Sequence, residues 1–226
     1  MAEHATDRLL QLLHDAARGS FPPADFATTH LPSPSSPTDA VLAFFGHHVI
    51  ASNVESSFVS EWTSRDPFAL SDVRFLAAFA NKLNTTPGIY DAVFAAPGEG
   101  VDARDIDFRE TDDRSHPRVV RALLYRDPAT IRVFHDVNGQ GLLVMGRGLA
   151  GRMEAAFEVV PEARGRGIGA SLVRAARLLA PSGEPVFLQV SPGTVWSMRA
   201  VMSDVAFRPV GSEILFLRTS LSDRVW

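Results

Sequence analysis

The chain has 226 residues, of which 46% are hydrophobic and 21% charged, and such a chain can bury a sizeable core without metal or disulfide support. Its net charge of −4 and its pI near 6.0 give no electrostatic reason to expect nucleic acid or a membrane surface as a partner. The absence of cysteine excludes disulfides, thiolate zinc sites and cysteine nucleophiles.

No targeting segment stands out in the sequence. The N-terminus is polar and acidic and lacks the basic and apolar regions of a signal peptide. No apolar stretch approaches the length of a membrane span. We therefore expect a cytoplasmic protein.

The first half of the chain alternates helical and extended patterns. A helix is predicted over residues 6–18, followed by a loop rich in proline and serine, and a strand pair or one bulged strand over 39–53. Three further elements are expected in this order: a helix over 56–62, a helix over 71–83 and an apolar strand over 90–96. The charged, turn-rich segment 101–117 is the best candidate for a domain boundary.

The second half has a clearer rhythm. Residues 119–126 fit a helix or a strand. Asn138-Gly139 lies between strand patterns over 130–137 and 142–149 and favours a hairpin turn, because both residues tolerate positive φ. The remaining predicted elements are a strand over 153–160, a helix over 171–179, a strand over 186–190, a helix over 194–204 and a strand over 208–218.

The segment that carries chemical information is FEVVPEARGRGIGA, residues 157–170. A strand ends there, a turn with three glycines follows, and a helix begins. The first turn of a helix has unbonded N–H groups and the positive end of the dipole, and glycine lets a phosphate approach them. Arg164 and Arg166 add positive charge. These features predict a pyrophosphate-binding turn.

The first of two motifs that compete for these glycines is a dinucleotide-binding fingerprint. Gly165, Gly167 and Ala170 fit the dinucleotide fingerprint of a Rossmann-type oxidoreductase. That fold needs a six-stranded parallel sheet, and too few residues follow Ala170 to complete one. The acidic residue Glu184 also precedes the next predicted strand instead of ending it. A Walker loop is excluded, because the chain has no Gly-Lys-Ser/Thr.

The segment resembles the cofactor-binding motif of GNAT acyltransferases, [Q/R]-x-x-G-x-[G/A], at Arg164, Gly167 and Gly169. The order of elements after it is also similar to the family's, and Ala206-Phe207 stands where the family usually has Gly-Phe. The resemblance covers roughly residues 130–217. It implies a GNAT-type mixed α/β fold, with a mostly antiparallel sheet flanked by helices, over 119–226. Residues 1–118 are then an α/β extension, either a degenerate second GNAT half or a substrate-binding region.

The resemblance implies acetyl-CoA as the co-substrate and no metal. In this family the fourth and fifth strands splay apart and the cofactor enters between them. The fourth strand corresponds here to residues 153–160, and Thr194 stands where the family often has an Asn that orders the CoA arm. An ordinary helix N-cap is the alternative for Thr194. The implied cofactor-binding residues are Phe157, Glu158, Val159, Arg164, Gly165, Arg166, Gly167, Ile168, Gly169, Ala170 and Thr194.

The family's catalytic pattern is matched less well. The place of its general-acid tyrosine falls on Met202 or Val201, and neither can donate a proton. The place of a base glutamate on the fifth strand is Gln189, which cannot act as a base. A thiolate leaves readily, so loss of the acid need not abolish transfer. The candidate catalytic carboxylates are Glu158, Glu154 and Glu213, each with a structural role as the alternative.

The predicted function is direct transfer of acetyl from acetyl-CoA to an amine of a small molecule or peptide. We expect no nucleic acid or membrane partner, and association into a homodimer stays open. The first alternative is a non-catalytic acyl-CoA-binding regulatory protein, favoured by Met202 and Gln189. The second is a Rossmann-type oxidoreductase, disfavoured by the chain order.

Overall fold

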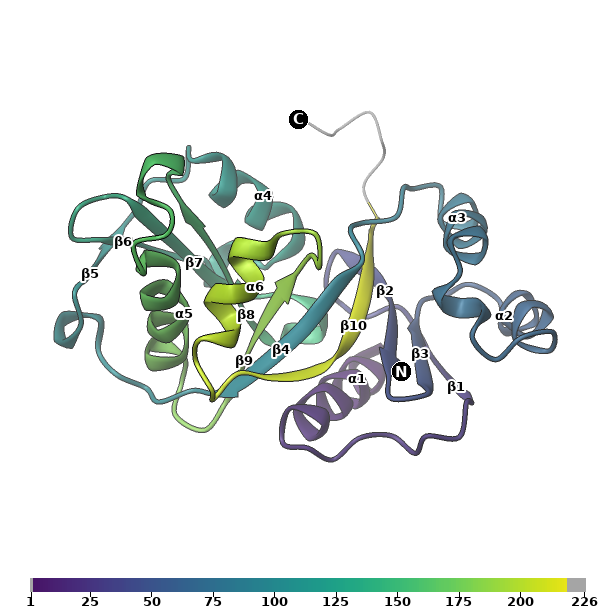
Figure 1. Ribbon diagram of the computed structural model, residues 1–226. Coiled ribbons are helices and arrows are strands. Elements are labelled where there is room, and N and C mark those ends of the chain that lie inside the picture. Colours follow the sequence, from purple (N-terminus) through teal and green to yellow (C-terminus); the bar gives the residue numbers. More distant parts are fainter. Residues whose placement is uncertain (1, 219–226) are drawn as a thin grey trace.

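A ten-stranded sheet runs through the whole protein (Figure 1). The computed structural model describes residues 2–218, and within them the strand order is β1-β3-β2-β10-β4-β9-β8-β7-β6-β5. The β1–β3 and β8–β9 pairs are parallel and the other neighbouring pairs are antiparallel, which confirms a mixed, mostly antiparallel sheet. The strands are β1 (Thr28–Leu31), β2 (Thr38–Phe44), β3 (His47–Ala51), β4 (Asp91–Pro97), β5 (Phe108–Thr111), β6 (Arg132–Asp136), β7 (Gly141–Arg147), β8 (Met153–Val159), β9 (Pro185–Val190) and β10 (Arg208–Leu217).

Six α-helices lie in the described range. They are α1 (Ala2–Ala17), α2 (Ser56–Thr63), α3 (Val73–Lys82), α4 (Pro117–Tyr125), α5 (Ile168–Leu179) and α6 (Val195–Met202). The segment 119–126, for which helix and strand were both open from the sequence, belongs to α4. Its start is well capped, because the His116 ring accepts a hydrogen bond from the Arg118 N–H and Pro117 occupies the first turn. No helix of residues 2–218 has both the length and the apolar content to cross a membrane.

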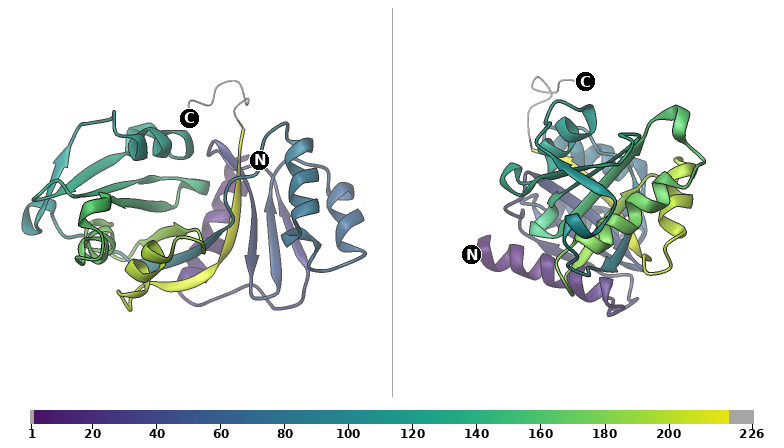
Figure 2. Two further views of the ribbon diagram at one scale, coloured as in Figure 1. Left: turned by 45° about the horizontal axis from the view of Figure 1, so that its top comes forward. Right: turned by 90° about the vertical axis from the view of Figure 1, so that its left-hand side faces the viewer.

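Helices cover both faces of the sheet (Figures 1 and 2). On the face that we call the α5 face, α5 and α6 pack over Leu143 and Leu188, and α2 and α3 pack over Ile214. On the opposite face, the α1 face, α1 covers Phe187 and α4 covers Leu142. Side chains alternate along each strand, so the neighbours Leu142 and Leu143 belong to different layers.

Two tight hairpins confirm predictions from the sequence. Between β2 and β3 the chain reverses at Phe45 and Gly46, both with positive φ (39° and 90°), so the 39–53 segment is a strand pair. Between β6 and β7 the turn contains Gly139, whose φ is 66°. Glycine adopts this backbone region without the steric penalty that a Cβ brings, and this explains the signal that Asn138-Gly139 gave.

Two short edge strands were not predicted. β1 lies in the segment expected to be a loop and pairs with β3. β5 lies in the segment 101–117, expected to be turn-rich, and pairs with β6. Each has only four residues, which is too short for an alternating pattern to show in the sequence.

Strand β4 belongs to the first half of the chain but lies among strands of the second half. Its Val93 pairs with Gln189 of β9 on one side and with Gly211 of β10 on the other. Strands from before and after residue 118 therefore belong to one continuous sheet. The division into 1–118 and 119–226 stays a prediction, and no break in the sheet marks it.

A buried ion network joins three elements on the α1 face. Arg152, directly before β8, is fully buried and donates to Glu154 at 2.8 Å and to both oxygens of Glu213 on β10, at 2.8 and 2.6 Å. Arg126, at the end of α4, donates to the other oxygen of Glu154 at 3.2 Å. The Arg152 guanidinium also lies 5.0 Å from the centre of the Phe187 ring. Both buried carboxylates therefore have a cationic partner, as burial of charge requires.

We expect Arg152→Met to lower the free energy of unfolding by about 3–5 kcal/mol, because Glu213 would stay buried without a cation and Glu154 would keep Arg126 alone. Denaturant unfolding measures the loss. Arg132→Met is the matched control, since it breaks a half-exposed pair with Glu110 and should cost less than about 1 kcal/mol. Equal losses in the two variants would contradict the role of the buried network.

Candidate functional site

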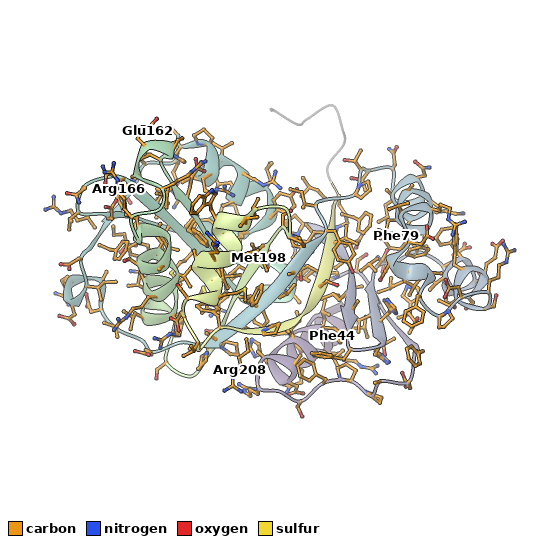
Figure 3. All side chains as sticks on the ribbon, viewed as in Figure 1. Phe44, Phe79, Glu162, Arg166, Met198 and Arg208 are labelled. Atoms are coloured by element: carbon orange, nitrogen blue, oxygen red, sulfur yellow. The ribbon has the colours of Figure 1, made fainter. Side chains whose placement is uncertain are left out.

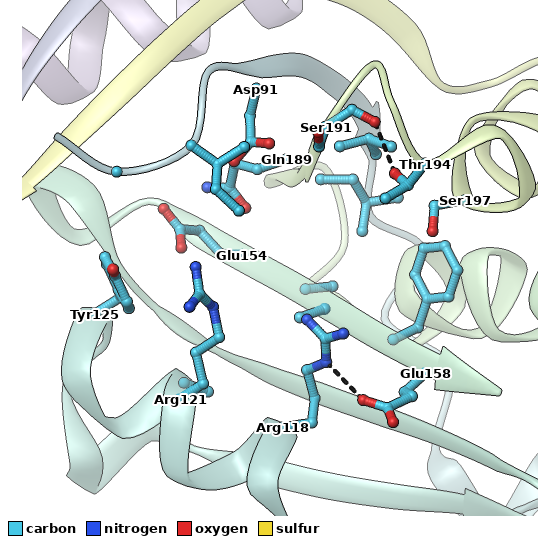
Figure 4. Close-up of a pocket in the computed structure, with 18 of the residues that line it drawn as sticks. Asp91, Arg118, Arg121, Tyr125, Glu154, Glu158, Gln189, Ser191, Thr194 and Ser197 are labelled. Carbon is cyan, nitrogen blue, oxygen red and sulfur yellow. Dashed lines mark hydrogen bonds and ion pairs between the residues drawn. The ribbon is translucent and has the colours of Figure 1, made fainter. Parts of the chain in front are cut away.

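A pocket of about 510 Å³ lies where β8 and β9 separate (Figure 4). The two strands pair in parallel over three residue pairs that begin at Met153↔Val186. Both continue past Ala155 and Leu188 without pairing to each other. Paired strands lie roughly 4.8 Å apart, so this divergence leaves backbone edges of both strands facing a gap.

The pocket is built from elements of both sheet faces. Its walls come from α4, β8, the end of β9, the start of α6, the segment that enters β4, and Leu215 of β10. The lining residues are Gly88, Ile89, Asp91, Pro117, Arg118, Arg121, Ala122, Tyr125, Arg126, Glu154, Ala155, Ala156, Phe157, Glu158, Leu188, Gln189, Val190, Ser191, Thr194, Ser197 and Leu215. Since α4 covers the α1 face and α6 the α5 face, the pocket connects the two sides of the sheet.

The turn between β8 and α5 exposes backbone donors. Gly165 and Gly167 have positive φ (79° and 84°), and Gly167 is the N-cap of α5. A Cβ at either glycine would meet no atom within 4 Å, so the space beside them is open. Within residues 2–218 no group accepts from the N–H of Gly165, Arg166 or Gly167, and the next N–H groups lie in the first helical turn. Such an edge suits an anion.

The side chains around this turn divide into two groups. Arg166 and Glu162 project from it at the edge of the molecule (Figure 3). Arg164 instead folds back, and its Nε donates to the Val159 carbonyl at 3.3 Å. Ile168 and Gly169 have packing roles: Ile168 fills the space beside Gly141, and a Cβ at Gly169 would lie 3.2 Å from the Ala200 Cβ. The small size of Gly169 is therefore explained by the contact between α5 and α6.

Three further predicted cofactor-binding residues, Phe157, Glu158 and Thr194, lie at the gap. Phe157 and Glu158 line the pocket from β8, whose other edge is paired with β7. Thr194 also lines the pocket and occupies the N-cap position of α6, but its hydroxyl does not cap the helix. It donates to the Ser191 carbonyl at 2.7 Å. Thr194 therefore stabilises the loop that connects β9 with α6.

The three predicted catalytic carboxylates are all held in ion pairs. Both oxygens of Glu213 accept from Arg152, and this side chain does not line the pocket. Burial alone would raise the pKa of Glu154, but Arg152 and Arg126 hold it below its ordinary value, which makes Glu154 a weak base. Glu158 pairs with Arg118 at 3.1 Å. These contacts favour the structural alternative for Glu154 and Glu213.

The positions that replace the family's acid and base differ in their surroundings. Val201 is buried in the core and Met202 is 66% exposed, and neither lines the pocket. Gln189 does line it, and its side-chain Nε2 is buried without a hydrogen-bond partner. A buried donor without an acceptor costs free energy, so this amide is available to a ligand oxygen in the pocket.

Asp91 was missed by the sequence reasoning. It begins β4, lines the pocket, and lies directly across the strand pair from Glu213. Burial, reinforced by the negative charge of Glu213 and partly offset by Arg121, raises the pKa of Asp91 to about 6. No described residue hydrogen-bonds its carboxylate. A single acidic residue at the start of an apolar strand carries no pattern, so only its tertiary neighbours identify it.

Helix α4 supplies a second set of pocket residues that the sequence did not indicate. Arg118, Arg121 and Tyr125 recur at helical spacing and line the same wall. Figure 4 shows Arg118 and Arg121 rising from α4 on the side opposite Asp91 and Gln189. The Arg121 guanidinium lies 5.4 Å from the centre of the Tyr125 ring.

Among the residues that the structure describes, no group of three or more His, Asp or Glu side chains is placed to hold a metal ion. The expectation that the reaction needs no metal stays a prediction.

Comparisons with known proteins add little beyond this geometry. No family model matches the chain, and no curated protein matches it. Among solved structures, a GNAT-family protein from Novosphingobium aromaticivorans DSM 12444 is 19% identical, with 57% of this chain and 63% of that chain covered and a TM-score of 0.40. An acetyltransferase of the GNAT family from Colwellia psychrerythraea is 12% identical, with 64% and 62% covered and a TM-score of 0.35.

The chain thus spans less than two thirds of the length of both structures. At these TM-scores the likeness supports no conclusion about activity, and the function proposed below depends on the residues of this chain.

Asp91→Asn should raise the free energy of unfolding at pH 7.5, by at most about 3 kcal/mol, because it removes a half-buried carboxylate that faces Glu213. The folded pKa of Asp91, about 6, exceeds the ordinary 3.8, so the wild-type protein gains stability as pH falls through this window. The advantage of the variant should therefore shrink between pH 6 and pH 4.

Thermal unfolding at several pH values tests this, with the exposed Asp107→Asn as control. A less stable Asp91→Asn protein at pH 7.5 would show that Arg121 outweighs burial.

Proposed function

We propose that the protein is an acetyl-CoA-dependent N-acetyltransferase of GNAT type. The observation that carries the proposal is the divergence of the parallel strands β8 and β9 beside a glycine turn with unbonded N–H groups. A gap between strands admits a thin, amide-containing arm, and the turn admits an anion. The resemblance of Arg164, Gly167 and Gly169 to the GNAT cofactor motif supports the same assignment.

The chain's own groups suit the parts of acetyl-CoA. The unpaired backbone edge of β8 from Ala156 to Glu158 offers N–H and C=O groups to the amides of the pantetheine arm. The N–H groups from Gly165 to Ala170 suit the pyrophosphate, with Arg166 adding charge. Arg164 also braces the end of β8, since its Nε donates to the Val159 carbonyl.

On the acceptor side, Asp91 is the group best suited to take a proton. The amine nitrogen attacks the thioester carbonyl, the C–N bond forms, the C–S bond breaks, and CoA leaves as the thiolate. The nitrogen loses one proton, which passes to the Asp91 carboxylate and then to solvent. With a pKa of about 6, Asp91 is a stronger base than an ordinary aspartate and is still ionised at neutral pH.

No proton donor for the thiolate is needed, because a thiolate is a good leaving group. Met202 and Val201 lie away from the pocket. The chain has two tyrosines, and they are placed differently. Tyr125 lines the pocket, whereas the Tyr90 hydroxyl is 2.8 Å from the Ser212 hydroxyl.

A non-catalytic acyl-CoA-binding protein is the second candidate, favoured by Gln189 in place of a base. An unpaired Asp91 with a raised pKa on the opposite side of the gap favours catalysis instead. A Rossmann oxidoreductase is incompatible with a mostly antiparallel sheet.

Coenzyme A should bind, and NADH should not. Gly167→Val should weaken CoA binding at least about tenfold, because a side chain there occupies the open space that a phosphate needs. Calorimetry measures the affinity. Gly183→Val is the matched control: it imposes similar positive-φ strain shortly before β9, at the end where β8 and β9 are paired, so it should lose stability and keep its CoA affinity. Tight NADH binding without CoA binding would overturn the proposal.

The pH–rate profile tests the role of Asp91. The carboxylate is the active form, so kcat/KM should rise with pH through an apparent pKa near 6. Asp91→Asn should lose about 100-fold or more in kcat, with CoA affinity retained and the acidic limb near pH 6 gone. A profile unchanged in the variant would assign the proton transfer to another group.

A further inference from the structure

Arg121 is a cation without a counterion in the pocket. No described carboxylate lies within ion-pair distance of its guanidinium, which lies over the face of the Tyr125 ring. Arg118, one helical turn earlier, uses Nε for Glu158 and presents its two terminal nitrogens to the pocket (Figure 4). Stacking on an aromatic ring orients a guanidinium and leaves its N–H groups for a ligand.

The opposite wall has the reverse polarity. Asp91 is an anion without a hydrogen-bond partner among the described residues, and Gln189 has a buried amide nitrogen without one. Arg121 is close enough to Asp91 to lower its pKa, yet the two side chains do not form an ion pair. A space therefore separates a cationic wall from an anionic wall.

The other charges at the pocket are already neutralised. Glu154 is compensated by Arg126 and Arg152, and Glu158 by Arg118. The charged groups that remain for a ligand are the Arg121 guanidinium on α4 and the Asp91 carboxylate on β4. In a partly enclosed site each would gain from a partner of opposite charge.

We infer that the acceptor is a small amine that also carries an anionic group, a carboxylate or a phosphate. Its nitrogen lies against Asp91 and Gln189, and its anionic group is bound by Arg121 with help from Arg118. This inference rests on the proposed acetyl transfer. An amine without an anionic group would leave Arg121 without a partner, and a polyamine would in addition place a second cation near it.

The test uses the full chain and matched acceptors. Acetyl transfer from acetyl-CoA is measured to the common amino acids, to their carboxamides, and to O-phosphoethanolamine against ethanolamine. We expect kcat/KM to favour the acceptor with the anionic group at least about tenfold over its neutral analogue. Preference within the amino acid pairs identifies a carboxylate, and preference for O-phosphoethanolamine identifies a phosphate.

Arg121→Gln should abolish this preference, because KM for the anionic acceptor should rise about tenfold or more relative to KM for the neutral analogue. Its affinity for CoA, measured by calorimetry, should be unchanged and reports that the variant is folded. Arg109→Gln, which removes an exposed charge from the edge strand β5, is the control and should keep the preference.

The outcomes separate the two proposals. Absence of CoA binding would overturn the proposed function and this inference with it. Binding of CoA with transfer to neutral amines or polyamines as fast as to anionic ones, or a preference that survives Arg121→Gln, would overturn the inference alone.

Discussion

The site depends on the ion pairs that the buried Arg152 guanidinium forms with Glu154 and Glu213. The guanidinium donates to Glu154 on β8 and to Glu213 on β10 while lying over Phe187 of β9, so it links three strands, and Glu154 and Phe187 belong to the stretch where β8 and β9 are paired. A buried carboxylate without such a partner would be strongly destabilising. With this end of the strands fixed, their divergence at the other end leaves a gap of defined position in an otherwise continuous sheet.

The same network shapes the electrostatics of the pocket. Glu213 forms an ion pair with Arg152, and it lies across the strand pair from Asp91. Burial is the larger cause of the raised pKa of Asp91, and the nearby negative charge adds to it. A structural ion pair thus contributes to the basicity of a residue in the site without touching a ligand. Glu213, which the sequence suggested as a candidate base, is bound by Arg152 and lies beside Asp91.

The pocket has two sides because it passes through the sheet. The glycine turn and the start of α6 lie on the side proposed for the cofactor, and α4 with the start of β4 lies on the side proposed for the acceptor. The gap between β8 and β9 connects these two sides of the sheet. For the proposed acetyl transfer, this geometry lets an amine and a thioester approach each other from opposite directions, which is the main requirement for direct transfer.

The sequence by itself determined the local elements and the glycine turn before α5. Periodicity and turn residues predicted the β2–β3 hairpin, the turn at Gly139 and the strand–glycine–helix unit around Gly167, because each depends on residues close together in the chain. Only the tertiary structure decided that β4 lies between β9 and β10, that Glu154 and Glu213 share Arg152, and that Asp91 faces Arg121 across a pocket. These contacts join distant parts of the chain, and whether a carboxylate is a base or half of an ion pair depends on burial and neighbours that no local pattern encodes.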